Sequence, residues 1–274
     1  MERTLAPPER RVARVSGVER LGAYHLVGAE DGGGPEPQPG QFYMLSAERG
    51  WGGHDGERPY LPRAFSHARA RASGSGVALD FLLEAIGPGT GRLAELAPGD
   101  GLALVGPLGT GFDRNVRGGR PLLVGGGIGV APLLCLEEEL GRSGDEPRVL
   151  VGFRTAAHAQ AAALFVGEPA VVTDDGSVGR RAFVTEMLRE ELDADPAARV
   201  FACGPPPMLE AVRALCAERE TPAQLALESG MACGFGACFG CVVPTRDGYL
   251  RLCVDGPVLD AERLDSALFP GSGH

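Results

Sequence analysis

The chain has 274 residues, of which 44% are hydrophobic and 23% are charged, the proportions of an ordinary globular protein. Its formal net charge of −10 argues against a DNA- or RNA-binding surface, which needs clustered positive charge. No apolar run reaches the roughly 18 residues that cross a bilayer, and the first residues lack the apolar core of a signal peptide. We therefore expect a cytoplasmic protein, with neither nucleic acid nor a membrane as its partner.

The first hundred residues have the pattern of a small β-barrel. Gly and Pro separate short stretches of strand-like composition, at the spacing that small antiparallel barrels show. The candidate strands are 11–15, 22–27, 41–45, 77–83 and 101–105. The barrel should close near Pro107. Two Gly-rich stretches, 31–40 and 49–58, are expected to be surface loops or insertions.

Two motifs in this part of the chain have the chemistry to hold a flavin nucleotide. Arg63-Ala64-Phe65-Ser66 combines a guanidinium fork, which suits a pyrophosphate, with a serine hydroxyl that can bond the edge of a flavin ring. Further on, the Gly-Thr turn at 87–91 offers backbone N–H groups to phosphate oxygens. Each motif alone is weak, because an ordinary strand end or turn can have the same sequence.

From Pro121 onwards, strands alternate with helices. The candidate strands are 122–124, 149–153, 170–173 and 200–203, and the candidate helices are 131–140, 181–192 and 207–218. This alternation predicts a parallel sheet with helices on both faces. A third, cysteine-rich segment begins near Ala223. The expected domain limits are therefore 1–110, 111–222 and 223–274.

A glycine run joins the first strand of this sheet to the first helix. Val124 is followed by Gly125-Gly126-Gly127-Ile128-Gly129, and a dinucleotide pyrophosphate binds at such a helix N-terminus. The run is not a strict G-x-G-x-x-G. A tight turn that only packs the helix on the strand is therefore the alternative.

Three later motifs follow strand ends of the same sheet. They are Gly152-Phe153-Arg154, Thr173-Asp174-Asp175-Gly176-Ser177 and Cys203-Gly204-Pro205-Pro206-Pro207-Met208. The third places a thiol at the carboxyl end of a parallel strand, where ligands of such sheets bind. The alternative for Cys203 is a small buried hydrophobe. Arg154 lies where the 2′-phosphate of NADP could be met, although the same position can serve NAD.

Four of the seven cysteines gather near the carboxyl end. Cys233, Cys238 and Cys241 have the spacing C-x4-C-x2-C, and Cys253 comes after eleven further residues. The first three spacings match the plant-type [2Fe-2S] pattern. The interleaved glycines allow a loop to wrap a cluster and to aim N–H groups at its sulfurs.

Other interpretations of this segment remain open. Zinc also takes four thiolates, and the four thiols could be unrelated buried residues. The segment has too few apolar residues to fold without a cross-link such as a bound metal, so we expect it to pack against the rest of the protein. Phe235 and Phe239 flank Cys238. Either both rings fill a small core around the site, or at least one points outward to anchor a partner.

Taken in this order, the motifs resemble those of the ferredoxin reductase superfamily, and within it the electron-transfer subunits of type B dihydroorotate dehydrogenases. The resemblance covers nearly the whole chain apart from the two Gly-rich stretches and the tail. Its most specific part is the cysteine segment together with Cys253-Val254-Asp255-Gly256-Pro257-Val258. The family often has other apolar residues at the positions of Ala64 and Phe65.

The resemblance implies a fold, three cofactors and their sites. The fold is a six-stranded antiparallel barrel that binds FAD, a parallel-sheet α/β domain that binds NAD, and a small [2Fe-2S] domain held by Cys233, Cys238, Cys241 and Cys253. Arg63 would hold the FAD pyrophosphate, and Ser66 would lie at the flavin edge. The rest of the FAD site would be Ala64, Phe65, Leu82, Leu83, Glu84, Gly89 and Thr90. The NAD site would be Gly125, Gly126, Gly127, Ile128, Gly129, Arg154, Asp174, Cys203, Gly204, Pro205 and Met208.

The same resemblance implies a reaction and a partner. Ser66 and Cys203 would be the catalytic residues beside the flavin and the nicotinamide. The partner would be an FMN-containing dihydroorotate dehydrogenase catalytic subunit in a heterotetramer. Its electrons would cross the cluster to FAD and reduce NAD⁺ in pyrimidine biosynthesis. The alternatives are the reductase subunit of a hydrogenase, a sulfide-linked reductase or a ferredoxin:NADP oxidoreductase, and a zinc-stapled nucleotide-binding regulator without redox activity.

Overall fold

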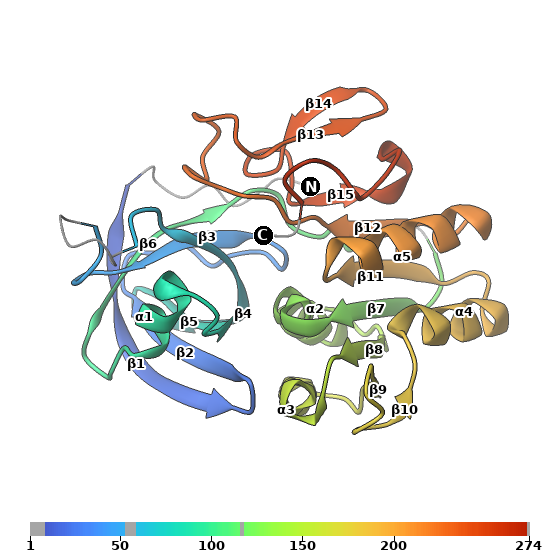
Figure 1. Cartoon of the computed structure of the whole chain (residues 1–274), viewed down its shortest axis with the longest axis horizontal. Coiled ribbons are helices and arrows are strands. Elements are labelled where there is room, and N and C mark those ends of the chain that lie inside the picture. Colours follow the sequence, from blue (N-terminus) through green and yellow to red (C-terminus); the bar gives the residue numbers. More distant parts are fainter. Residues whose placement is uncertain (1–8, 53–58, 116–117, 273–274) are drawn as a thin grey trace.

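The computed structural model describes residues 9–52, 59–115 and 118–272. A barrel and a helix-covered sheet lie side by side, and the cysteine-rich segment runs along one end of both (Figure 1). Most of the second Gly-rich stretch, which is predicted to be a surface loop or insertion at 49–58, lies at 53–58 outside the described part of the chain. No helix of the described residues is long and apolar enough to cross a membrane.

Six antiparallel strands close the barrel, which confirms the predicted fold of the first part. They are β1 (Arg11–Leu21), β2 (Tyr24–Asp31), β3 (Phe42–Ala47), β4 (Arg63–Ser73), β5 (Gly76–Glu84) and β6 (Gly101–Leu108). Their order around the barrel is β1-β2-β5-β4-β3-β6. Alternate residues such as Tyr43 and Leu45 on β3 fill the interior, because successive side chains of a strand point to opposite faces. A short helix, α1 (Pro88–Ala94), follows β5.

Two parts of the barrel differ from the sequence prediction. Strand β4 is not among the predicted strands, because its sequence RAFSHARARAS is poor in the β-branched residues that mark strands. The Gly-rich stretch 31–40 is also more than a surface loop. Gly40 has a φ of +91°, and a methyl group there would lie 2.8 Å from Cγ2 of Val258. Gln41, which follows it, is fully buried and donates to the Gly109 carbonyl at 2.9 Å.

Seven strands form the second sheet, in the order β10-β9-β8-β7-β11-β12-β15. They are β7 (Pro121–Gly126), β8 (Arg148–Phe153), β9 (Ala170–Thr173), β10 (Arg180–Arg181), β11 (Arg199–Cys203), β12 (Ala223–Ala226) and β15 (Val258–Asp260). All neighbouring strands are parallel except β12 and β15. The strand order reverses between β7 and β11, which makes their carboxyl ends the topological switch point of this sheet.

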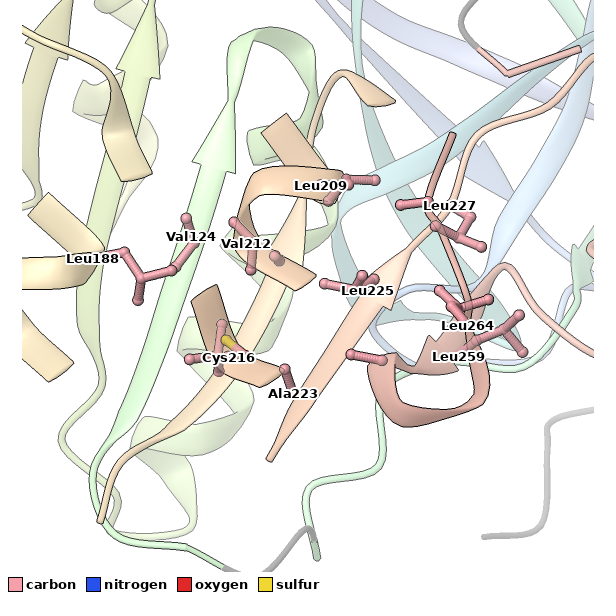
Figure 2. Packing of buried hydrophobic residues seen from close by; sticks show 14 of the residues in the cluster. Val124, Leu188, Leu209, Val212, Cys216, Ala223, Leu225, Leu227, Leu259 and Leu264 are labelled. Carbon is pink, nitrogen blue, oxygen red and sulfur yellow. The ribbon is translucent and has the colours of Figure 1, made fainter. Parts of the chain in front are cut away.

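Helices cover both faces of the sheet, as predicted. They are the 3₁₀ helix η1 (Gly127–Val130), α2 (Ala131–Arg142), α3 (Ala156–Ala159), the 3₁₀ helix η2 (Gln160–Leu164), α4 (Val184–Ala194) and α5 (Pro206–Glu218). Leu123 of β7 packs in the core that contains α2, and the next residue, Val124, packs in the core that contains α4 and α5. Figure 2 follows this second core from Val124 and Leu188 through Leu225 to Leu264.

The cysteine-rich segment shares both its hydrogen bonds and its core with the rest of the chain. Its hairpin is β13 (Val242–Thr245) with β14 (Gly248–Arg251), and a 3₁₀ helix, η3 (Ala261–Arg263), follows β15. Cys241 and Cys253 belong to the same buried cluster as Leu225 of the sheet and Met44 of the barrel. Two strands of the large sheet, β12 and β15, thus belong to the segment that begins at residue 223. The limits 1–110, 111–222 and 223–274 stay a proposal about functional units.

Candidate functional site

The first group of predicted residues lies where β4 begins, beside the turn that precedes α1. A methyl group on Gly89 would lie 2.8 Å from Nε of Arg63, so glycine is the residue that lets the guanidinium approach this turn. The Thr90 hydroxyl oxygen accepts the backbone N–H groups of Ile86 and Gly87 at 3.0 and 3.1 Å. The Thr90 side chain therefore holds this turn beside the Arg63 guanidinium. A guanidinium next to a Gly-Thr turn is a combination of groups that can bind a diphosphate.

The other residues predicted for this group differ in what they can contribute. Ser66 makes no side-chain hydrogen bond within the described residues, which leaves its hydroxyl available. Phe65 packs at the edge of the barrel core, and Ala64 is exposed. Leu82 and Leu83 are fully buried in two different cores, so only their backbone could face a cofactor.

The second group lies at the topological switch point. Cys203 of β11 is the register partner of Gly125 on β7, which brings the glycine run and the CGPP motif together. A methyl group on Gly129 would lie 2.6 Å from the Cys203 carbonyl oxygen, and one on Gly126 would lie 2.5 Å from Sδ of Met208. Gly129 therefore permits a close approach of two backbones just before α2, where N–H groups can face an anion, and Gly126 leaves room for the Met208 side chain.

The Cys203 thiol is held in its neutral form. Burial raises its pKa to about 12, and the Glu228 carboxylate acts in the same direction. At neutral pH the side chain is thus a compact neutral group and not a nucleophilic thiolate. Such a group can sit beside an apolar ring and adds no charge to it.

An ion pair joins the barrel to the sheet beside this switch point. Nη2 of Arg154, after β8, lies 2.8 Å from Oε1 of Glu84 at the end of β5. Nε2 of His158 lies 3.3 Å from the same oxygen, and its Nδ1 lies 2.9 Å from the Thr155 hydroxyl. Arg154 therefore pairs with a barrel residue while its side chain stays 63% exposed. No motif in the sequence indicates a role for His158, which lies in an alanine-rich stretch, or its pairing with Glu84.

Asp174 follows β9, the strand next to β8. Its backbone N–H donates to the Phe153 carbonyl at 2.9 Å, and its carbonyl accepts Nε of Arg181 at 3.1 Å. The nearby Ser177 hydroxyl accepts the backbone N–H of Ala156 at 2.7 Å. The loops after β8 and β9 are thus tied together, and they place the exposed Asp174 carboxylate at the same edge of the sheet as Arg154.

The four cysteines of the third group are arranged as two pairs. The sulfurs of Cys241 and Cys253 are buried and lie 3.2 Å apart. Cys233 is hydrogen-bonded to Cys238, which is the exposed member of the set. Among the residues that the structure describes, no three ligand side chains converge as they would around a single metal ion. Two pairs are the arrangement that a two-iron cluster needs, with two thiolates for each iron.

The loop around these cysteines depends on positive backbone angles. Gly234 and Gly236 have φ values of +79° and +91°, which glycine adopts readily. Burial alone would raise the pKa of the Cys233 thiol, but hydrogen bonds from the backbone of Cys238 and Phe235 lower it to about 6. The loop therefore supplies N–H groups to sulfur, as a thiolate-bound cluster requires.

The cysteine loop rests directly on the barrel. A methyl group on Gly234 would lie 2.4 Å from Cγ of Met44 and 3.2 Å from Cδ1 of Leu108. Met44 of β3 is in turn the register partner of Ala64 on β4. The loop is thus one strand away from the Arg63–Ser66 motif. Phe235 and Phe239 are 60% and 63% exposed, so neither ring fills a core around the cysteines.

Comparison with known proteins gives consistent names. The family model for the iron-sulfur cluster binding domain of dihydroorotate dehydrogenase B matches residues 228–265. A relative from Clostridium acetobutylicum, named dihydroorotate dehydrogenase B (NAD(+)), electron transfer subunit, is 35% identical over 250 residues, which are 88% of this chain and 94% of the relative. A relative of the same name from Geobacillus thermodenitrificans is 44% identical over 183 residues, which are 64% of this chain and 69% of the relative.

Solved structures share the fold at lower identity. An NADH-dependent reduced ferredoxin-NADP oxidoreductase structure superposes with a TM-score of 0.75 at 22% identity, and the match covers 93% of this chain and 90% of the other. A ferredoxin NADP+ reductase from Neisseria gonorrhoeae, with bound FAD and NADP, gives a TM-score of 0.60 at 17% identity, covering 77% of this chain and 91% of the other.

Proposed function

The chain belongs to the family of electron-transfer subunits of dihydroorotate dehydrogenase B, and from this premise we propose which of its residues bind each cofactor. It is an oxidoreductase subunit that carries electrons between NAD and a catalytic partner subunit by way of FAD and a [2Fe-2S] cluster. One observation supports the route above all others: the cysteine loop packs on Met44, the register partner of Ala64 in the flavin motif. Cluster and flavin would then be neighbours.

The cofactors supply the electron chemistry, since FAD exchanges a hydride with nicotinamide and single electrons with a cluster. Arg63 and the turn at Gly89 and Thr90 would bind the diphosphate of FAD. The Ser66 hydroxyl would hydrogen-bond the flavin edge. The glycine run from Gly125 to Gly129, with Gly204, Pro205 and Met208, would hold the nicotinamide nucleotide across the switch point, and the neutral Cys203 would lie beside the nicotinamide ring.

The ion pair of Arg154 supports NAD over NADP as the nucleotide. The guanidinium expected near a 2′-phosphate is already bonded to Glu84 at 2.8 Å. Its charge is therefore balanced before any nucleotide arrives. Asp174, at the end of the neighbouring strand, would accept a hydrogen bond from a ribose hydroxyl of NAD, whereas its charge would repel a phosphate.

Cofactor content and anaerobic reduction test this proposal. We expect purified protein to contain stoichiometric FAD and iron, and NADH to bleach the flavin and to reduce the cluster. Flavin absorbance reports the first step, and electron paramagnetic resonance reports the second. Stoichiometric zinc without iron, or a flavin that NADH leaves oxidised, would refute the assignment.

The partner that we propose is an FMN-containing catalytic subunit that oxidises dihydroorotate, joined to this chain in a heterotetramer. Phe239 supports a docking surface at the cysteine loop. Its φ is +60°, an uncommon angle that costs about 1–3 kcal/mol and is found at functional sites. The Arg251 guanidinium lies 5.4 Å from the centre of its exposed ring and helps to hold it outward.

Phe239→Ala should weaken binding to such a subunit by about 30-fold, because truncation of an aromatic anchor costs roughly 2 kcal/mol. Both cofactors and NADH-linked dye reduction should be retained. Titration calorimetry with the catalytic subunit measures the affinity. Val166→Ala, which removes an exposed apolar side chain outside the cysteine segment, serves as the control. Unchanged affinity of Phe239→Ala would remove this ring from the interface.

A further inference from the structure

An open pocket of about 300 Å³ lies on the barrel beside the start of β4. Trp51, Tyr60 and Pro62 form one wall, and Met44 of β3 and Arg10 before β1 form part of the rest. The pocket is therefore aromatic and largely apolar, with one cation at its edge. Concave apolar sites with few polar groups are the usual form of small-molecule pockets.

Two features of Trp51 suit a planar heterocycle. The indole N–H is shielded from solvent and has no acceptor within the described residues, and such an unpaired donor costs about 1–3 kcal/mol. The ring lies next to the proposed diphosphate site, since its centre is 5.9 Å from the Arg63 guanidinium. Tyr60 presents a second aromatic ring that is 68% exposed.

The direction of β4 indicates which half of a bound FAD would reach this pocket. Arg63 is the first residue of the strand, and Ser66 lies three positions further along it. A diphosphate at Arg63 with the flavin at Ser66 leaves the adenosine to extend the other way, past Leu61 towards Tyr60 and Trp51. Arg63 already points in that direction, because its Nη1 donates to the Leu61 carbonyl at 2.5 Å.

A second pocket of similar volume fits adenine less well. It lies against α1 and is lined by Glu48, Arg49, Arg92, Glu95 and Asp100. Three carboxylates face two guanidinium groups there, with no aromatic ring for a base to stack on. The aromatic pocket is the one with the chemistry of a base-binding site, because every nucleobase has a face that stacks on aromatic side chains.

We propose that Trp51 and Tyr60 form the adenine subsite of the bound FAD and that this subsite makes the chain prefer FAD to FMN. The inference rests on the proposed function, because it concerns the half of the cofactor that FMN lacks. The flavin and its first phosphate would bind equally well without the subsite. Adenine stacking would add affinity only for the dinucleotide.

The test compares two flavins on the full chain after its flavin has been removed and its cluster retained. We expect Trp51→Ala to raise the Kd for FAD by about tenfold to a hundredfold, the range of base–aromatic stacking, and to leave the Kd for FMN unchanged. Quenching of flavin fluorescence on binding reports both constants. Trp51→Phe, which keeps a ring but loses the N–H, should lie between, and Tyr60→Ala should lower FAD affinity alone.

Tyr249→Ala is the matched control, because it removes a ring that is 78% exposed on β14 and should change neither constant. Equal loss of FAD and FMN affinity in the Trp51 and Tyr60 variants would overturn the subsite and assign the rings to folding. Unchanged FAD affinity, with or without weaker partner binding, would also overturn it. Failure of the unaltered chain to bind FAD would instead refute the proposed function. If Trp51→Ala does not fold, Trp51→Phe and Tyr60→Ala decide the question.

Discussion

Replacement of Cys238 by serine should reduce electron delivery to the catalytic subunit by at least about 100-fold, while NADH still reduces the FAD. Cys238 is the exposed thiol of the four proposed ligands. A serine hydroxyl is a poor substitute for it, because iron-sulfur clusters favour soft thiolate ligands. The cluster should therefore be lost or unstable in this variant.

Flavin reduction should survive because the residues proposed for hydride exchange lie in other parts of the chain. Gly129 and Cys203 meet at the switch point of the parallel sheet, and Ser66 lies on barrel strand β4. None of these belongs to the cysteine loop. A missing cluster therefore interrupts the route after the flavin and not before it.

Single-turnover mixing with NADH, followed by a second mixing with the FMN subunit, separates the two steps. Cys216→Ala is the control, because it removes a thiol from α5, outside the cysteine segment, and should leave both steps intact. If Cys238→Ser binds FAD and yet NADH no longer reduces it, the two steps are not separable as proposed. Normal electron delivery to the partner would remove Cys238 from the ligand set.

The parallel sheet shows how far local patterns reach. The glycine run and the helical pattern that follows it predict a helix over 131–140, and α2 spans Ala131–Arg142. Strand–helix alternation is a local signal of period and punctuation, so the sheet could be predicted closely. Strand β4 could not be predicted in this way, because its alanines and arginines have low strand propensity. It forms a strand because it pairs with β3 and β5, which are distant in sequence or follow a turn.

Contacts between distant segments were the part that the sequence could not supply. The spacing of Cys233, Cys238 and Cys241 identifies a cluster loop, but nothing in that spacing says that Gly234 rests on Met44. The pairing of Glu84 with Arg154 joins residues seventy positions apart. Such contacts depend on how domains pack, and no local period encodes them. They are also the contacts that set the distances between cofactors.

The contact between Gly234 and Met44 leads to the second large effect, because it seats the cysteine loop on the barrel. Gly234→Ala should destabilise the loop by about 2–5 kcal/mol. The positive φ of +79° accounts for about 1–2 kcal/mol of this. The overlap of a methyl group with Cγ of Met44, at 2.4 Å, adds about 1–3 kcal/mol. Electron transfer between flavin and cluster should slow in the same variant.

A double-mutant cycle isolates the contact from the backbone strain. Met44→Ala removes the overlapping atoms, so Gly234→Ala should cost about 1–3 kcal/mol less in that background. Gly248→Ala is the matched control, since Gly248 has a φ of +120° with no atom within 4 Å of the added methyl group; it should show strain without coupling to Met44. The midpoint of urea unfolding, followed by the visible circular dichroism of the cluster, measures each variant. Equal costs of Gly234→Ala in both backgrounds would mean that Met44 does not seat the loop, and the short route between flavin and cluster would lose the contact that supports it.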